Sequence, residues 1–205
     1  MARLFLVRHG QTDANRDGLA LGRLDISLNE LGLSQVRRVA GALADEPFAA
    51  VYTSPLQRTR QTADEIVADR DLDIQVDESL IEMDVGEMDG LTFREVRERY
   101  PDFLQTWMSP EGPTHRMPGG ERLVDVHSRA VNFLDHVMQR HPEESTCAVT
   151  HNFVILTTLV HVLGIDLASF RRLRHAVAAI SVLEVEGDRW RIARMNDTRH
   201  LEIFR

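Results

Sequence analysis

Two short, largely apolar runs, each with a histidine at its carboxyl end, limit the folds that this chain can adopt. Residues 4–7 precede Arg8 and His9, and residues 147–150 precede His151. Short apolar runs bounded by polar residues are typical of strands buried on both faces of a parallel sheet. The carboxyl ends of such strands face the crevice in which α/β proteins bind ligands. We therefore expect both histidines to face one pocket.

Apolar spacing along the rest of the chain predicts helices and strands in alternation. Helices are expected over residues 29–43, 55–68, 92–107 (interrupted at 101), 122–141 and 153–163, and strands over residues 4–7, 49–53, 74–76, 146–150, 180–185 and 190–193. The last two strands flank residues 186–189 and are expected to form a hairpin. This order predicts an α/β fold, a three-layer α/β/α sandwich with a mostly parallel central sheet and an antiparallel edge.

Chain length and proline content predict how the chain is divided. The 205 residues suffice for one well-buried core, so we expect a single domain over residues 1–205. Residues 109–120 hold three prolines and three glycines, which is typical of a long irregular loop with a function. We therefore expect a small lid-like region over residues 92–120, called the lid segment below.

Composition narrows the partners and the compartment. The net charge of −8 disfavours nucleic acids and anionic membranes as partners. No run approaches the ~20 apolar residues that span a bilayer, and the strand pattern at the N-terminus leaves no room for a signal peptide. Cys147 is the single cysteine and is expected to be buried and inert, which suits a reducing compartment. We expect a cytoplasmic protein.

The basic residues exclude two classes of enzyme. All 24 are arginines, and the chain contains no lysine. A Walker-type phosphate-binding loop requires a lysine, and Schiff-base enzymes require an amine nucleophile. An anionic ligand must therefore be held by a few locally placed guanidinium groups.

The first strand end carries the residues of a phosphoryl acceptor. A neutral imidazole such as that of His9 can accept a phosphoryl group when a hydrogen bond fixes its tautomer. Arg8 would neutralise the phosphoryl oxygens, and Gly10 would let the backbone approach a ligand closely. Arg58 lies near the start of the helix expected after Ser54 and Pro55, where amide groups and the helix dipole favour an anion.

Leaving-group protonation and charge stabilisation require further residues. Glu82 is flanked by apolar residues that would raise its pKa and keep it protonated, but Asp84 and Glu87 are rival carboxylates that spacing does not rank. His151 is expected to donate to a phosphoryl oxygen in the transition state. The remaining histidines have no metal-ligand spacing, so no metal is implied.

Several sequence blocks resemble the histidine phosphatase superfamily, the phosphoglycerate-mutase-like group, over nearly the whole chain. The matching blocks are residues 8–12 with Asn15, residues 53–63 with Arg58, Glu82 followed by residues 86–90, His151, and residues 118–121 and 196–201. The resemblance implies a phosphoglycerate-mutase-like fold. It also implies that His9 is the phosphorylated nucleophile and that Glu82 is the acid/base residue, which settles the ranking of the three carboxylates.

The resemblance further implies a set of phosphate ligands and a function. Arg8, Asn15, Arg58, His151 and the backbone amide of Asn152 would hold the phosphoryl group. The expected activity is hydrolysis of small phosphorylated metabolites through a phosphohistidine, without metal or cofactor. The alternatives are a cofactor-dependent phosphoglycerate mutase, an α-ribazole phosphatase as a specific substrate assignment, and a phosphate-binding module without activity. Mutases of this superfamily are generally longer, which favours the phosphatase.

The sequence constrains the substrate-binding residues and the oligomeric state less than it constrains the fold and the catalytic residues. The expected contributors to the pocket are Gln11, Thr12, residues 93–107 and residues 115–117, with Arg23 and Arg116 as candidates for binding a second anionic group. A hairpin at the edge of the sheet is also compatible with a homodimer.

Overall fold

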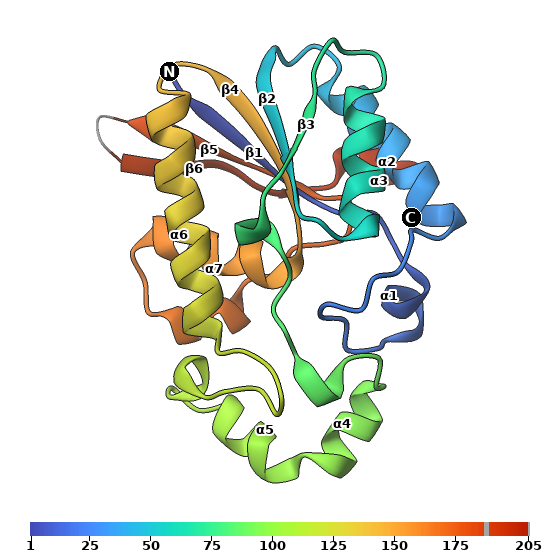
Figure 1. Cartoon of the computed structure of the whole chain (residues 1–205), viewed down its shortest axis with the longest axis vertical. Coiled ribbons are helices and arrows are strands. Elements are labelled where there is room, and N and C mark those ends of the chain that lie inside the picture. Colours follow the sequence, from blue (N-terminus) through green and yellow to red (C-terminus); the bar gives the residue numbers. More distant parts are fainter. Residues whose placement is uncertain (187–188, 205) are drawn as a thin grey trace.

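The fold centres on a six-stranded sheet, seen in a computed structural model that describes residues 1–186 and 189–204 (Figure 1). The strands are β1 Arg3–Arg8, β2 Phe48–Thr53, β3 Ile74–Val76, β4 Ser145–Thr150, β5 Ile180–Glu186 and β6 Arg189–Asp197. Their order in the sheet is β3-β2-β4-β1-β5-β6. The first four of these strands pair in parallel, and β5 and β6 are antiparallel to their neighbours. The expected mostly parallel sheet with an antiparallel edge is confirmed.

Helices cover both faces of the sheet. They are α1 Asp13–Asp17, α2 Glu30–Leu43, α3 Gln57–Val67, α4 Phe93–Arg99, α5 Pro101–Trp107, α6 Leu123–Arg140 and α7 Asn152–Leu163. Short 3₁₀ turns lie at Glu78–Leu80, Gly86–Met88, Gly112–Thr114, Leu167–Arg172 and Arg199–Phe204. In Figure 1, α6 and α7 lie to the left of the sheet and α2 and α3 to the right. The three-layer α/β/α arrangement follows.

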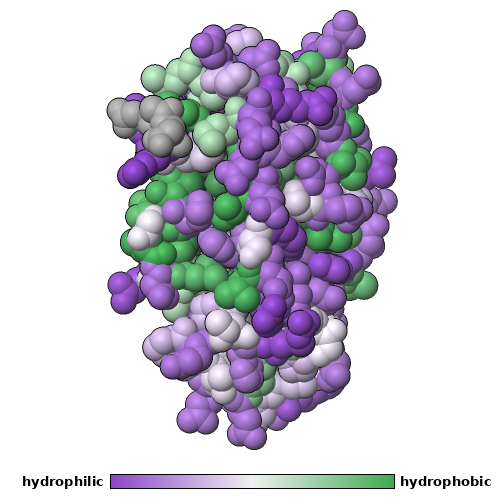
Figure 2. All heavy atoms as spheres, turned by 60° about the vertical axis from the view of Figure 1, so that its left-hand side comes forward, coloured by the Kyte–Doolittle hydropathy of each residue, from purple (hydrophilic) through white to green (hydrophobic). Residues whose placement is uncertain are grey.

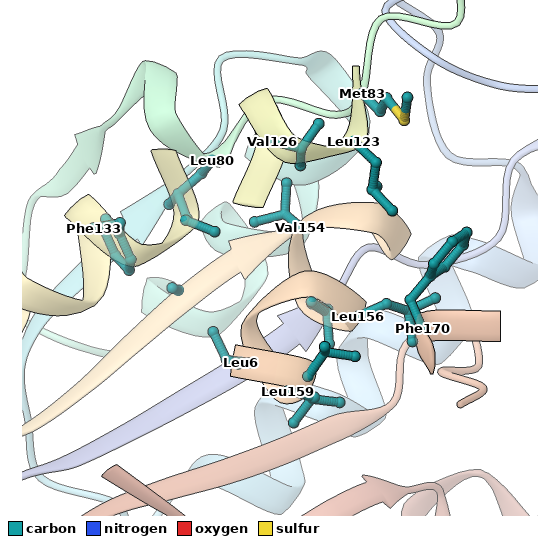
Figure 3. Close-up of a cluster of buried hydrophobic side chains, with 14 of the residues drawn as sticks. Leu6, Leu80, Met83, Leu123, Val126, Phe133, Val154, Leu156, Leu159 and Phe170 are labelled. Atoms are coloured by element: carbon teal, nitrogen blue, oxygen red, sulfur yellow. The ribbon is translucent and has the colours of Figure 1, made fainter. Parts of the chain in front are cut away.

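Alternate residues of the central strands divide the core between these layers. Leu4 and Leu6 join a buried cluster with residues of α6 and α7, part of which is drawn in Figure 3. Phe5 and Val7 point to the other face and pack against residues of α2 and α3. Both faces of the strand are therefore buried, as the continuous apolar run predicts, and each buried leucine stabilises the fold by roughly 1.5–3 kcal/mol. Cys147 is buried as expected, and burial raises the pKa of its thiol to about 12.

The structure corrects two expectations about helix boundaries, and a third, about a turn, lies outside the described residues. The helix expected from residue 55 begins at Gln57, because Ser54 does not cap it: the Ser54 hydroxyl lies 2.7 Å from Nε2 of His151. The helix expected over 92–107 with a break at residue 101 is broken one residue earlier, at Tyr100, and Pro101 begins the second helix. The strands of the terminal hairpin are present, but the turn residues 187 and 188 lie outside the described part of the chain.

The lid segment lies apart from the sheet. In Figure 1, α4 and α5 form the lower end of the molecule, and Figure 2 shows mostly hydrophilic and neutral side chains on the face of that end in view. Phe103 and Trp107 of α5 are instead partly or largely buried. Their burial indicates that the apolar side of the lid faces the body of the protein. Within residues 1–186 and 189–204, none of the helices combines the length and apolar character needed to cross a bilayer.

Candidate active site

The two strand-end histidines lie beside each other at the centre of the sheet. Strands β1 and β4 are neighbours, and Arg8 at the end of β1 pairs with Thr150 at the end of β4. The chain then continues from β1 to helices on one face and from β4 to α7 on the other face. Such a reversal opens a ligand-binding crevice at the carboxyl ends of the strands. The rings of His9 and His151 lie there, with centroids 5.2 Å apart.

His9 is held as a neutral imidazole with one nitrogen free to react. Its Nδ1 lies 2.7 Å from the carbonyl oxygen of Gly10, and because a carbonyl only accepts, Nδ1 carries the hydrogen. Burial, followed by the charges of Arg58 and Arg8, holds the pKa of His9 well below its ordinary value. The lone pair of the ring therefore resides on Nε2.

Arg8 keeps its charge in a buried position. Its Nη1 donates to Oδ1 of Asn152 at 3.1 Å and to the carbonyl oxygen of His175. Burial lowers the pKa of Arg8 to about 10, so the guanidinium stays protonated at neutral pH. Its Nε is buried and has no hydrogen-bond partner among the described residues. The group thus retains a donor for a ligand.

Arg58, in the first turn of α3, is a second buried guanidinium. Its Nη1 donates to the carbonyl oxygen of Leu24 at 2.9 Å, and its Nη2 donates to that of Gly22 at 2.7 Å. Burial lowers its pKa, partly opposed by the charge of Glu82. In the described part of the chain, Nε of Arg58 is also buried without a partner. An anion beside Arg58 would offset the cost of burying this charge.

His151 precedes the first residue of α7 and is fully buried. Burial, then the charges of Arg58 and of His9, hold its pKa well below the ordinary value. Its Nε2 contacts the Ser54 hydroxyl at 2.7 Å, while Nδ1 has no partner among residues 1–186 and 189–204. Three polar atoms without a partner among the described residues, on Arg8, Arg58 and His151, therefore lie around His9. Buried polar groups usually have partners, so this cluster indicates a place for a ligand with acceptor oxygens.

Glu82 supplies a buried carboxyl group to the same site. Its Oε1 accepts from the backbone amides of Met83 at 2.8 Å and of Phe153 at 3.2 Å. Burial raises its pKa above the ordinary value, although these amides and the charges of Arg58 and Arg8 oppose the shift. A raised pKa suits a general acid.

The two rival carboxylates have other environments. Asp84 is half-buried and accepts from the backbone amide of Gly86 at 2.9 Å, whereas Glu87 is exposed and accepts from the hydroxyl of Tyr100 at 3.0 Å. Neither of these two carboxylates lines the cavity that opens onto His9, whereas Glu82 does.

A cavity of about 460 Å³ opens onto these groups. The catalytic candidates Arg8, His9 and Glu82 line it, together with Gln11, Asn15 and Asn152. Arg58 and His151 are fully buried beside His9 and do not line it. The structure therefore brings together most of the residues expected from the sequence.

Three expected substrate-binding residues lie outside the wall of the cavity. Thr12 is buried and caps α1, where its amide and hydroxyl both donate to Oδ1 of Asn15. The Asn15 side-chain oxygen is thereby engaged, which leaves its NH₂ group as the part that can bind phosphate. Arg23 forms ion pairs with Asp84 and Glu121, and Nη1 of Arg116 donates to the carbonyl oxygen of Gly120.

Sequence patterns did not identify two residues that hold the site. Ser54 supports His151, and the carbonyl group of His175 supports Arg8. A side chain at Gly10 would come within 2.7 Å of the carbonyl oxygen of Gly32. The absence of a side chain at Gly10 therefore also allows close packing against the first turn of α2. The described residues contain no group of three or more His, Cys, Asp or Glu side chains placed to hold a metal.

Known proteins resemble this chain over its length. The model of the histidine phosphatase superfamily (branch 1) matches residues 4–198. Phosphoserine phosphatase 1 of Hydrogenobacter thermophilus is 34% identical over 204 residues, which cover 100% of this chain and 96% of that protein. The structure of YhfR of Bacillus stearothermophilus gives a TM-score of 0.91 at 28% identity, covering 98% of this chain and 100% of that one. A mycobacterial glucosyl-3-phosphoglycerate phosphatase, solved with VO3, gives 0.87 at 29% identity, covering 96% and 99%.

The fold and the site therefore define a phosphoric monoester hydrolase. The chain belongs to the histidine phosphatase superfamily, branch 1, and the resemblance seen in its sequence is confirmed.

Proposed function

We propose that this phosphatase hydrolyses small phosphate monoesters by transferring the phosphoryl group first to His9 and then to water. One observation carries the proposal: the neutral His9, with its Nε2 lone pair free, lies among donors of Arg8, Arg58 and His151 that have no partner in the described part of the chain. A nucleophile surrounded by donors for the phosphoryl oxygens is the arrangement that phosphoryl transfer requires.

In the first step, Nε2 of His9 attacks phosphorus in line with the ester bond. The N–P bond forms as the ester P–O bond breaks, and the carboxylic acid of Glu82 gives its proton to the leaving oxygen. The raised pKa of Glu82 favours the protonated form that this step needs. His9 becomes a positively charged phosphohistidine, which the carbonyl group of Gly10 stabilises through Nδ1–H.

In the second step, the carboxylate of Glu82 takes a proton from water, and the water oxygen attacks phosphorus. The N–P bond breaks, inorganic phosphate leaves, and His9 returns to the neutral form. Glu82 regains its proton, so the enzyme is restored without a co-reactant. The same residue acts as acid and then as base.

The phosphoryl oxygens would be held by guanidinium and neutral donors instead of a metal. Arg8 and Arg58 supply the positive charge, and Asn15 and the backbone amide of Asn152 supply further donors. When Ser54 donates to Nε2 of His151, Nδ1 of that ring carries the hydrogen and donates to the phosphoryl group. Activity should therefore survive dialysis against a chelator, and its loss would contradict a metal-free mechanism.

Trapping of the phosphoenzyme tests the proposal. We expect a base quench during turnover of p-nitrophenyl phosphate to yield a protein carrying one phosphoryl group on His9, stable in base and labile in acid. The exposed His161 on α7 offers a matched control, because the H161A variant should form the same intermediate. A fully active enzyme that carries no phosphoryl group in rapid-quench samples would overturn the proposal. Isomerisation of 3-phosphoglycerate that outruns phosphate release would instead indicate a mutase.

A further inference from the structure

Beyond the polar residues at the strand ends, the cavity has an apolar wall. Of the twenty described residues that line it, thirteen are Ala, Val, Leu, Met, Phe or Trp. Most of them come from the loop after α1, with Leu19 and Leu21, from the lid segment, with Phe103 and Trp107, and from the start of α7, with Phe153. A pocket with a few convergent polar groups and a large apolar wall favours ligands with an apolar body.

The aromatic part of this wall is held in a fixed geometry. Phe103 and Trp107 stack with ring centroids 5.9 Å apart and planes 18° apart, and the Phe153 ring meets Trp107 edge-on at 6.5 Å. Arg171 donates to the carbonyl oxygen of Trp107, and its guanidinium lies 5.3 Å from the centre of the Trp107 ring. The lid segment is thereby attached to the body, so the wall is formed before substrate binds.

Charge is confined to the catalytic end of the cavity. Among the described lining residues, only Arg8 and Glu82 carry ionisable acidic or guanidinium groups, and both act in the proposed chemistry. Arg23 and Arg116, the candidates for a second anion, lie outside the wall and are engaged elsewhere. A substrate carboxylate placed against the apolar wall would therefore find no charged partner among the described residues there, which is unfavourable.

We propose that the substrate of this phosphatase is a phosphate monoester of an uncharged alcohol with an apolar body about the size of an aromatic ring. Phosphoamino acids and phosphoglycerates are then poor substrates, although two proteins similar to this chain are named for a phosphoserine and for a glucosyl-3-phosphoglycerate activity. The phosphate occupies the strand ends, and the alcohol lies against Phe103, Trp107 and Phe153. This inference rests on the proposed function, since it places the phosphate at His9.

The test compares 3-phenylpropyl phosphate with its para-carboxy derivative, whose leaving alcohols have similar basicity. We expect kcat/KM to be at least about tenfold higher for the uncharged ester, because an apolar pocket rejects an unpaired charge, and a similar advantage over phosphoserine. Equal or faster hydrolysis of the carboxylated ester or of phosphoserine would overturn the substrate inference and leave the phosphatase mechanism intact. Failure to hydrolyse any of the three esters would overturn both.

Two arginine substitutions in the lid segment distinguish a charge placed at the cavity wall from a charge placed elsewhere on the lid. Phe93 lines the cavity and is 58% exposed, whereas Met108 is 66% exposed and does not line it. F93R should bring a guanidinium to the cavity and shift the ratio of the two kcat/KM values toward the carboxylated ester by about tenfold. M108R should leave the ratio unchanged. An unchanged ratio in F93R, or the same shift in M108R, would contradict the proposed position of the alcohol.

Discussion

The catalytic end of the cavity rests on two central strands of the sheet, whereas much of its remaining wall comes from the lid segment. His9 follows β1, and His151 follows β4, in the middle of the hydrogen-bonded ladder. Phe103 and Trp107 lie instead on a seven-residue helix that is apart from the sheet in Figure 1. The first region is buried and charged, and the second is apolar and more exposed.

The residues proposed to transfer the phosphoryl group are therefore different from the residues proposed to select the substrate. At the strand ends, backbone carbonyls fix the side chains: Gly10 orients His9, Gly22 and Leu24 hold Arg58, and His175 holds Arg8. Such a site tolerates little change, because Arg8 and Arg58 depend on groups from segments distant in the sequence. The lid segment contributes side-chain surface to the cavity, so its substitutions should change which ester is preferred more than how the phosphoryl group is transferred.

The largest effect is expected for replacement of the nucleophile. H9A removes the atom that forms the bond to phosphorus, so kcat/KM for any phosphate ester should fall by about 10³-fold or more. Steady-state rates measured with p-nitrophenyl phosphate and with an alkyl phosphate check this. The melting temperature should not fall sharply, because H9A removes a buried polar ring. Retention of more than a tenth of the activity would show that another group accepts the phosphoryl group.

The next largest effect concerns proton transfer by Glu82. E82Q keeps the shape of the side chain but can neither give nor take the proton, so turnover of alkyl phosphates should fall by about 10²–10⁴-fold. A p-nitrophenolate leaving group needs no proton, so E82Q should release one equivalent of p-nitrophenol in a rapid burst before slow turnover. Stopped-flow absorbance measures the burst. If E82Q lowered the rate of the first step equally for alkyl and nitrophenyl esters, the role of Glu82 as the acid would be contradicted.

The same carboxyl group gives a pH dependence. Because burial raises the pKa of Glu82, its acid form persists above the ordinary range of a glutamate. The first step with an alkyl ester should therefore slow as pH rises through this raised pKa, while the burst with p-nitrophenyl phosphate should decline less.

Much of the catalytic end can be predicted from the sequence because its signals are local. An apolar run followed by a histidine specifies both a buried strand and what lies at its end, and this prediction places His9 and His151 together correctly. The helix near Arg58 is predicted to within two residues.

Other features depend on contacts between distant segments and have no local signal. Ser54 has the sequence signature of a helix cap, but its hydroxyl contacts His151, 97 positions away. Glu82 differs from Asp84 and Glu87 because it is buried beside the amide of Phe153, which spacing alone does not show. Residues 93–107 contribute to the cavity wall as expected, but which of their side chains face the cavity depends on how the lid packs. The partners of Arg23 and Arg116 could not be read from the sequence.

The next prediction, of intermediate size, concerns the pH dependence of the free energy of unfolding, which is expected to depend on a histidine at the catalytic end. His175 is buried, and burial, followed by the charge of Arg8, lowers its pKa to about 3 from an ordinary value near 6.5. Between these values the unfolded chain binds a proton that the folded chain does not, so this group destabilises the fold as pH falls below 6.5. H175Q removes this dependence. From pH 6.5 to pH 5, wild type should lose about 2 kcal/mol more stability than the variant.

Urea unfolding at several pH values measures the difference between wild type and H175Q. The two stability curves should converge on acidification, because only wild type carries the titrating group. Parallel curves would show that His175 binds its proton equally in the folded and unfolded states. Burial of His175 would then not make the stability of the fold sensitive to acid.

The smallest effect is expected in the lid segment. F103A removes one ring from the cavity wall while leaving the strand ends intact, so kcat/KM for 3-phenylpropyl phosphate should fall by about tenfold, the value of a lost apolar contact. The loss should appear mainly in KM and should be smaller for phosphoserine, which has no apolar body to place against the ring. M108A, in the same segment but outside the cavity wall, should behave like wild type. If F103A lowered kcat equally for all esters, the lid would act by positioning the catalytic end, and the separation of the two regions would fail.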